Sequence, residues 1–145
     1  MQRTPRQVLE ELIDSVPARR FEALPDLYAP DAVVHHPMQL PVPATIEGRN
    51  ALAEHFQRAA QLPLEMRAEN VVIHQTADPE VVIAEFDYWA RNIATGAEFT
   101  VANVFVVRVR EGLIVESRDY SNHVMFAAAF GRLHAVADEL AGARG

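Results

Sequence analysis

The chain has 145 residues, half of them hydrophobic and 23% charged, which is the size and composition of one globular domain. It contains no cysteine, which excludes disulfide scaffolds and cysteine-based metal or redox sites. The formal net charge is −7 and the arginines are scattered, so nothing favours a nucleic-acid partner. No apolar run has the length of a signal peptide or a membrane helix, so we expect a cytoplasmic protein with no membrane partner.

The first half of the chain has mainly helical patterns. Thr4, Pro5 and Gln7 predict a capping box, followed by apolar residues at helical spacing until Pro17 ends the helix. A shorter helix with a break at Pro25 follows.

The next residues predict a strand, a loop and a third helix. Residues 31–36 are a β-branched run closed by proline and predict a strand. Residues 37–47 hold three prolines and predict a loop. A helix then begins at Gly48 with a stripe of Leu52 and Phe56, and ends near residue 62.

From about residue 65 the pattern becomes extended. The four predicted strands are residues 65–76, 80–93, 97–110 and 113–121, and the short turns between them indicate an antiparallel meander. Residues 123–141 turn helical again, although Gly131 lies within that stretch. This order of elements predicts an α+β fold in one domain over residues 1–145.

The central strands of this meander are apolar on both faces. Val101, Phe105 and Val107 share one face of a strand whose other face carries Val104 and Val106. Helices can cover only one face of the sheet, and an apolar face left open usually meets a second copy of the chain. We therefore expect a homodimer formed through the sheet.

Three sequence segments resemble a known family. The segments YAPDAVVHHP, IEGRNAL and VFVVRVREGLIVESRDYSN, in this element order, resemble the SnoaL-like branch of the nuclear-transport-factor-2-like superfamily over roughly residues 5–135. That branch includes polyketide cyclases, ketosteroid isomerases, limonene epoxide hydrolase and phenazine-biosynthesis proteins. The resemblance implies a cone-shaped, curved antiparallel or mixed sheet wrapped around N-terminal helices and enclosing an apolar pocket. It implies no single reaction, because one fold carries many chemistries.

The resemblance to the ketosteroid isomerases fails at their catalytic positions. Their aspartate base falls at His36, their oxyanion-binding tyrosine near Leu12 and their proton-donating aspartate near Phe105. Isomerisation by that set of residues is therefore not expected.

The limonene epoxide hydrolase pattern is half present. Its two aspartates correspond to Asp119 and Asp87, but its arginine becomes Glu85, its tyrosine Val34 and its asparagine His36. The phenazine proteins carry a catalytic glutamate at the position of Asp119.

Asp119 is the strongest candidate for a catalytic residue. Strand alternation places Asp119 with Val115 and Ser117 on one face of the strand. An acid facing an apolar cone loses hydration, which raises its pKa toward the range useful for acid–base catalysis. The alternative is that Asp119 ends the strand or caps the following helix.

Three other polar side chains are candidates for the same pocket. Glu85 and Asp87 share a strand face. There Asp87 is a further catalytic candidate and Glu85 a substrate-binding candidate, or both remain solvated or paired with Arg91 or Arg108. His36 is a catalytic candidate as a neutral base or hydrogen-bond donor, or is a satisfied histidine in the wall. The histidine spacing supports no metal site, and we expect no cofactor.

The remaining candidates would bind substrate or line the pocket. Asn103 could present its amide to a substrate oxygen, and His123 is noted because it follows Asp119 closely. The other expected binding residues are Val34, Phe56, Trp89, Phe105 and Ser117, with Met125, Phe126 and Phe130 as lining or lid.

Two classes of function fit these residues. The first is a cofactor-free enzyme that transfers protons on an apolar polyketide- or terpenoid-type molecule, with cyclisation favoured over isomerisation or epoxide opening. The second is a dimeric protein that binds a small ligand without catalysis. Convergence of Asp119, Asp87 and His36 on one cavity would favour the enzyme.

Overall fold

The computed structural model describes residues 2–144, and its central feature is a six-stranded mixed sheet. The strands are β1 (Tyr28–His36), β2 (Ala44–Glu47), β3 (Leu64–Gln75), β4 (Val81–Asn92), β5 (Glu98–Arg110) and β6 (Leu113–Ser121). Their order across the sheet is β2-β1-β6-β5-β4-β3. β1 and β6 pair in parallel, whereas all other neighbours are antiparallel. The parallel pair therefore joins the first half of the chain to the meander.

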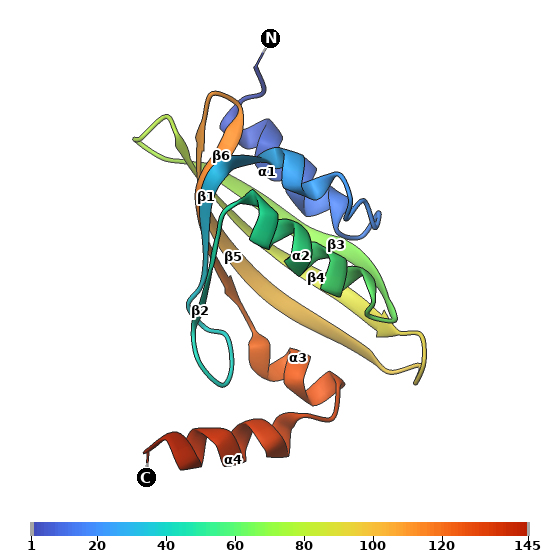
Figure 1. The fold of residues 1–145 in the computed structure, drawn as a ribbon. Helices are drawn as coiled ribbons and strands as arrows, with labels where there is room; N and C mark the ends of the chain where they lie inside the picture. The colour runs from blue at the N-terminus through green and yellow to red at the C-terminus, as the bar shows by residue number, and fades with distance from the viewer. Residues whose placement is uncertain (1, 145) are drawn as a thin grey trace.

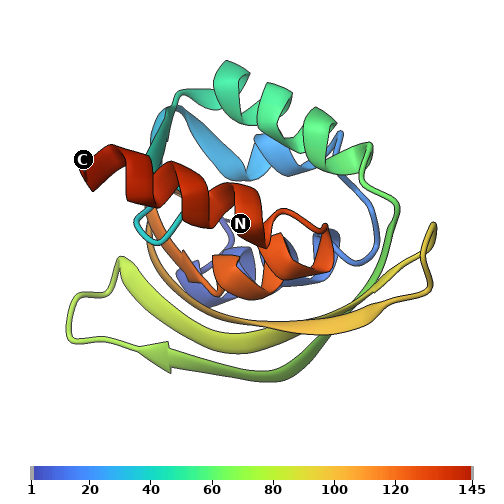
Figure 2. The same cartoon turned by 90° about the horizontal axis from the view of Figure 1, so that it is seen from below.

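Helices α1 and α2 lie on the concave face of this sheet. The helical segments are α1 (Pro5–Ser15), the 3-10 turn η1 (Leu24–Leu27), α2 (Arg49–Ala60), α3 (His123–Ala129) and α4 (Leu133–Arg144). Seen along the strands, the sheet bends around α1 and α2, while α3 and α4 lie at one end of it (Figures 1 and 2). This arrangement confirms the predicted α+β class with a curved mixed sheet around N-terminal helices.

The start of α1 follows its sequence signal. The Thr4 hydroxyl accepts from the Gln7 backbone N–H at 3.1 Å, and the Gln7 side chain accepts from the Thr4 N–H at 2.9 Å. This capping box satisfies backbone donors that a helix start would leave unpaired. The apolar stripe that follows, including Val8, Leu9 and Leu12, is buried against the sheet.

The core lies between these helices and the inward-facing residues of the strands. Along β4 every second residue is buried, from Val82 to Asn92. In β5 the buried residues are odd-numbered instead. The pairing of the two strands places Phe86 beside Asn103 and Ala84 beside Phe105. This alternation means that residues with odd numbers in β4 face outward.

Two predicted elements in the first half differ from the structure. The expected helix around Pro25 is only the four-residue turn η1, because Tyr28 already belongs to β1, where it aligns with Ile114 of β6. The expected loop at residues 37–47 contains β2, whose Thr45 and Ile46 pair with β1. Pairing with a neighbouring strand, rather than local sequence, makes both segments extended.

The single helix expected at residues 123–141 is two helices. Gly131 adopts a left-handed conformation, with φ of +68°, and separates α3 from α4. α3 begins at an Asn122 cap, whose side chain accepts from the Met125 backbone N–H. Across residues 2–144, the helices are each too short or too polar to span a bilayer.

Candidate active site

The concave side of the sheet holds a cavity of about 160 Å³ beneath α1 and α2. Its apolar walls come from four elements and the segment after α1: Leu12, Val16, Phe21, Val34, Leu52, Phe56, Ala59 and Phe105. Its polar lining consists of Tyr28, His36, His55, Tyr88 and Asp119. Of the predicted site residues, the structure thus brings together Asp119, His36, Val34, Phe56 and Phe105.

Asp119 is a buried carboxyl at the floor of this cavity. β6 turns it inward opposite Phe105 of β5, and its exposed fraction is 6%. Burial raises the pKa of Asp119 to about 7, against the opposing effect of a hydrogen bond from the Ser117 hydroxyl. Near neutral pH the group can therefore both accept and donate a proton. It does not cap α3, since Asn122 has that role.

Ser117 holds the carboxyl in place from the same strand. Its side chain is fully buried and its hydroxyl donates to Oδ1 of Asp119. Ser117 does not line the cavity itself, so it contacts Asp119 rather than an occupant.

Two tyrosines face the same space. Burial raises the pKa of Tyr28 well above its ordinary value, and the charge of Asp119 raises it further. Burial and the charge of Asp119 also raise the pKa of Tyr88, whose hydroxyl donates to the Ile13 carbonyl at 2.9 Å. Both phenols therefore stay protonated and neutral at working pH, and each hydroxyl oxygen can also accept a hydrogen bond.

His36 lies at the end of β1 in a group of three histidines. Its ring centroid is 5.6 Å from that of His55 in α2 and 6.4 Å from that of His123 at the start of α3. Burial, with smaller contributions from the neighbouring histidines, lowers the pKa of His36 to about 4. His36 is therefore neutral at pH 7. Its buried Nε2 has no hydrogen-bond partner among the residues that the structure describes.

These histidines do not form a metal site. Within residues 2–144, no three side chains of the metal-binding types are arranged to hold an ion. Two neutral imidazoles, those of His36 and His55, instead line the cavity with Asp119.

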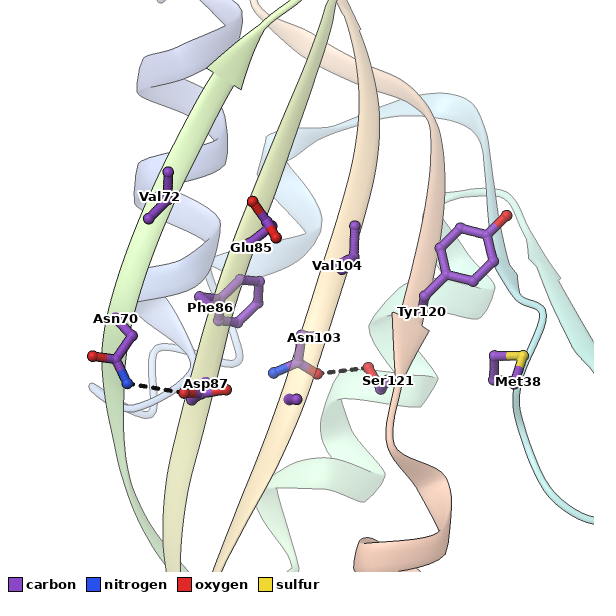
Figure 3. A pocket seen from close by; sticks show the side chains of 11 residues that line it. Met38, Asn70, Val72, Glu85, Phe86, Asp87, Asn103, Val104, Tyr120 and Ser121 are labelled. Atoms are coloured by element: carbon purple, nitrogen blue, oxygen red, sulfur yellow. Dashed lines mark hydrogen bonds between the residues drawn. The ribbon is translucent and has the colours of Figure 1, made fainter.

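The prediction that Asp87 and Asp119 share one cavity is wrong. Asp87 faces the opposite side of the sheet, where it borders a shallow hollow of about 510 Å³ (Figure 3). Its carboxylate accepts from the Asn70 amide at 2.9 Å. The cause is strand parity: β4 turns its even-numbered residues inward, and Asp87 lies between Phe86 and Tyr88.

Glu85 and Trp89 share this outward parity and are also absent from the cavity. Glu85 pairs with His74 rather than with either expected arginine, at 2.6 Å between Oε2 and Nε2. The guanidinium of Arg67 stacks 3.9 Å from the ring centre of Trp89. Neither side chain can reach an occupant next to Asp119.

Asn103 is buried, yet its amide is already used. Its Nδ2 donates to the Val101 carbonyl at 2.9 Å, and its Oδ1 accepts from Ser121 at 2.7 Å (Figure 3). It borders the outer hollow, so the expected amide contact to a substrate is not formed beside Asp119.

The aromatic residues of α3 cover a different part of the sheet. Phe126 packs edge-on to Phe99, with 6.2 Å between ring centroids, and Phe130 packs on the same ring. They close a second, smaller core at the far end of β5. Met125, Phe126 and Phe130 do not line the cavity of Asp119.

The sequence interpretation missed His55, Tyr28 and Tyr88. His55 had a detectable signal, since it lies three residues after Leu52 and four before Ala59 on the apolar stripe of α2. Tyr88 shares inward parity with Phe86 on β4. No sequence signal placed Tyr28 in the cavity, because its strand was expected to begin only at Asp31.

Sequence comparison identifies the family. The SnoaL-like domain family matches residues 9–117, which span α1 through most of β6. The chain belongs to this SnoaL-like family. The match confirms the resemblance seen in the sequence. The matched residues include part of every element that lines the Asp119 cavity, but they end at Ser117, before Asp119 itself.

Three proteins are similar to this chain in sequence or in fold. An uncharacterised PhzA/B-like protein of Pseudomonas aeruginosa is 30% identical over 119 residues, covering 81% of this chain and 84% of the relative. A Bacillus subtilis protein provisionally assigned as an isomerase is 25% identical, with a TM-score of 0.79 and coverage of 86% and 91%. A Pseudomonas putida protein provisionally assigned as a polyketide cyclase shares the fold at 16% identity, with a TM-score of 0.73 and coverage of 87% and 97%.

Proposed function

We propose that this SnoaL-like protein is a cofactor-free enzyme that moves a proton on a small, largely apolar molecule. The observation that carries the proposal is Asp119: a buried carboxyl in an apolar cavity, with its pKa raised by burial to about 7. General acids and bases work best when their pKa lies near the working pH. The carboxyl faces neutral imidazoles rather than a paired cation, which leaves its proton free to exchange with a bound molecule.

In the proposed reaction the Asp119 carboxylate accepts a proton from a C–H or O–H group of the substrate. His36 is neutral and cannot share that proton at pH 7, so it serves as a hydrogen-bond partner to the substrate oxygen where charge develops. Asp119 then returns the proton at another atom, which balances an isomerisation or a ring closure. Cyclisation remains the favoured reaction because the ketosteroid isomerase residues are replaced.

Epoxide opening by paired aspartates is not supported. That reaction would need the second acid in the same cavity, and Asp87 lies on the other side of the sheet. The provisional isomerase and cyclase assignments of the relatives agree with proton transfer as the shared chemistry.

The direct test is Asp119→Asn, which keeps the size of the side chain and removes its proton. Turnover should fall by about 10²–10⁴-fold, the usual contribution of general acid–base catalysis. Affinity should change little, because apolar walls supply most of it. Near-normal product formation by this variant would falsify the assignment and favour a protein that only binds its ligand.

The outer face of the sheet supports a homodimer as a second proposal. Val72, Val104 and Tyr120 border the outer hollow with exposed fractions of 50%, 37% and 37%. Both signs of charge lie on the same face, since Glu85, Asp87 and Arg91 share the outward parity of β4 and Arg67 aligns with the outward-facing Trp89. A second copy of this chain would cover the apolar residues and could match these charges with its own.

A further inference from the structure

The size and the charge of the Asp119 cavity restrict what it can hold. We infer that its occupant is an uncharged molecule no larger than one six-membered ring with a short substituent. This inference rests on the proposed function, since it names the substrate class of the same site. It narrows the proposed substrate to a molecule smaller than a multi-ring polyketide.

The volume sets the size limit. The cavity measures about 160 Å³, close to the roughly 150 Å³ at which an apolar protein cavity holds one benzene. Sites for drug-sized ligands measure about 300–1,000 Å³. A second fused ring therefore needs space that this cavity does not provide.

The walls cannot easily give way. Phe105 is held edge-on by Phe86, with 4.9 Å between ring centroids. Phe56 packs against Tyr28 at 6.0 Å and His55 at 5.4 Å. Enlarging the cavity would separate these packed rings, which costs the contacts that hold the core together.

The charges of the lining favour a neutral occupant. Among the described residues, none that lines the cavity is an arginine, and the chain contains no lysine. An anion would lose its hydration and face the Asp119 carboxyl without a counter-ion. An ammonium could meet that carboxyl, but one partner rarely offsets the desolvation of both charges in an apolar site.

One polar substituent can be accommodated at a defined place. His36 lines the cavity and its buried Nε2 has no partner among residues 2–144, so a hydroxyl or carbonyl oxygen of the occupant that reached this nitrogen would satisfy it. A ring placed among Leu52, Phe56 and Phe105 would direct such a substituent toward His36 and Asp119.

Four small compounds of matched shape test this inference by binding alone. Benzyl alcohol, benzylamine and benzoate differ mainly in charge, and 2-naphthalenemethanol adds one ring. Each is titrated into the full chain while the methyl NMR signals of Val34 and Leu52 are followed. Benzyl alcohol should shift these signals and bind at least tenfold more tightly than each of the other three.

A cavity-filling variant locates the binding. Ala59→Leu places a larger side chain in the cavity wall and should weaken benzyl alcohol at least tenfold. Gln57→Leu makes a similar change on the exposed side of the same helix and should leave binding unchanged. Circular dichroism checks that both variants fold. The comparison of the four probes uses the unmodified chain and does not depend on either variant.

Several outcomes would overturn the inference. Equal or tighter binding of 2-naphthalenemethanol would remove the size limit, and equal or tighter binding of benzoate or benzylamine would remove the charge limit. Absence of methyl shifts at millimolar benzyl alcohol would contradict both. The proposed function fails separately, if benzyl alcohol binds as expected but Asp119→Asn leaves turnover of the true substrate intact.

Discussion

The hydroxyl of Ser117 donates a hydrogen bond to Oδ1 of Asp119, two residues further along the same strand. Both side chains are buried, and Asp119 has no arginine partner among the described ion pairs. A hydrogen bond to the charged form partly counters the effect of burial. The balance between these two effects places the pKa of Asp119 near neutrality.

Ser117→Ala should raise the pKa of Asp119 above its value of about 7, because the carboxylate loses a donor while burial persists. Carboxyl ¹³C chemical shifts followed through a pH titration measure this directly. Ser121→Ala is the matched control, since Ser121 also lies on β6 but its hydroxyl donates to Asn103 of β5 and not to Asp119. An unchanged pKa in Ser117→Ala would show that this hydrogen bond does not control the acid.

Asp119→Asn should stabilise the fold above pH 7. The pKa of Asp119 is higher in the folded state, about 7 against 3.8, so the folded chain retains a proton that the unfolded chain releases. Stability is thus lost as pH rises from about 4 to 7, by on the order of 4 kcal/mol. Asp119→Asn cannot titrate and does not lose this stability. Its free energy of unfolding in urea, relative to that of the wild type, should therefore increase as pH rises through the same range. Equal stability of the two proteins at pH 8 would contradict the raised pKa.

His36→Gln should recover stability at low pH. Burial lowers the pKa of His36 to about 4, so between pH 6.5 and 4 only the unfolded chain gains a proton. That protonation stabilises the unfolded chain, and the wild type should therefore lose stability as pH falls through this window. Glutamine cannot titrate, so the slope of unfolding free energy against pH should decrease. His134→Gln, on an exposed position of α4, is the control.

His36→Gln should also reduce turnover less than Asp119→Asn does. A neutral imidazole that only donates or accepts a hydrogen bond can be partly replaced by an amide, whereas the proton carrier cannot. Comparison of kcat for the two single variants distinguishes a hydrogen-bonding role of His36 from a role in proton transfer. Equal losses would make His36 a second proton carrier.

The chain should sediment at about twice its mass of 16.2 kDa at micromolar concentration. Val104→Arg places a charge in the exposed apolar hollow and should shift the equilibrium toward monomer. Gln57→Arg, on the exposed side of α2, should not. A wild-type chain that sediments as a monomer would remove the dimer proposal.

The sequence by itself determined α1, α2, the four meander strands and the inward direction of Asp119. The capping box at Thr4 and the apolar stripe after it are local signals, and they specify α1 without help from the rest of the chain. Alternation along residues 113–121 placed Ser117 and Asp119 on one face, as observed. These features repeat with the period of the backbone, so neighbouring residues suffice to predict them.

Only the tertiary structure decided which side chains share the cavity. Asp87 and Asp119 both lie on strands of one sheet, and their sequence context gave no reason to separate them. The register of β4 against β5 turns Asp87 outward and the register of β6 against β5 turns Asp119 inward, and a shift of one residue in either pairing would reverse that direction. His36 and His55 meet for the same kind of reason: α2 folds back over β1, and the packing of a helix on a sheet is absent from either segment alone. Strand register and helix docking are long-range properties, and they brought together the acid and the imidazoles.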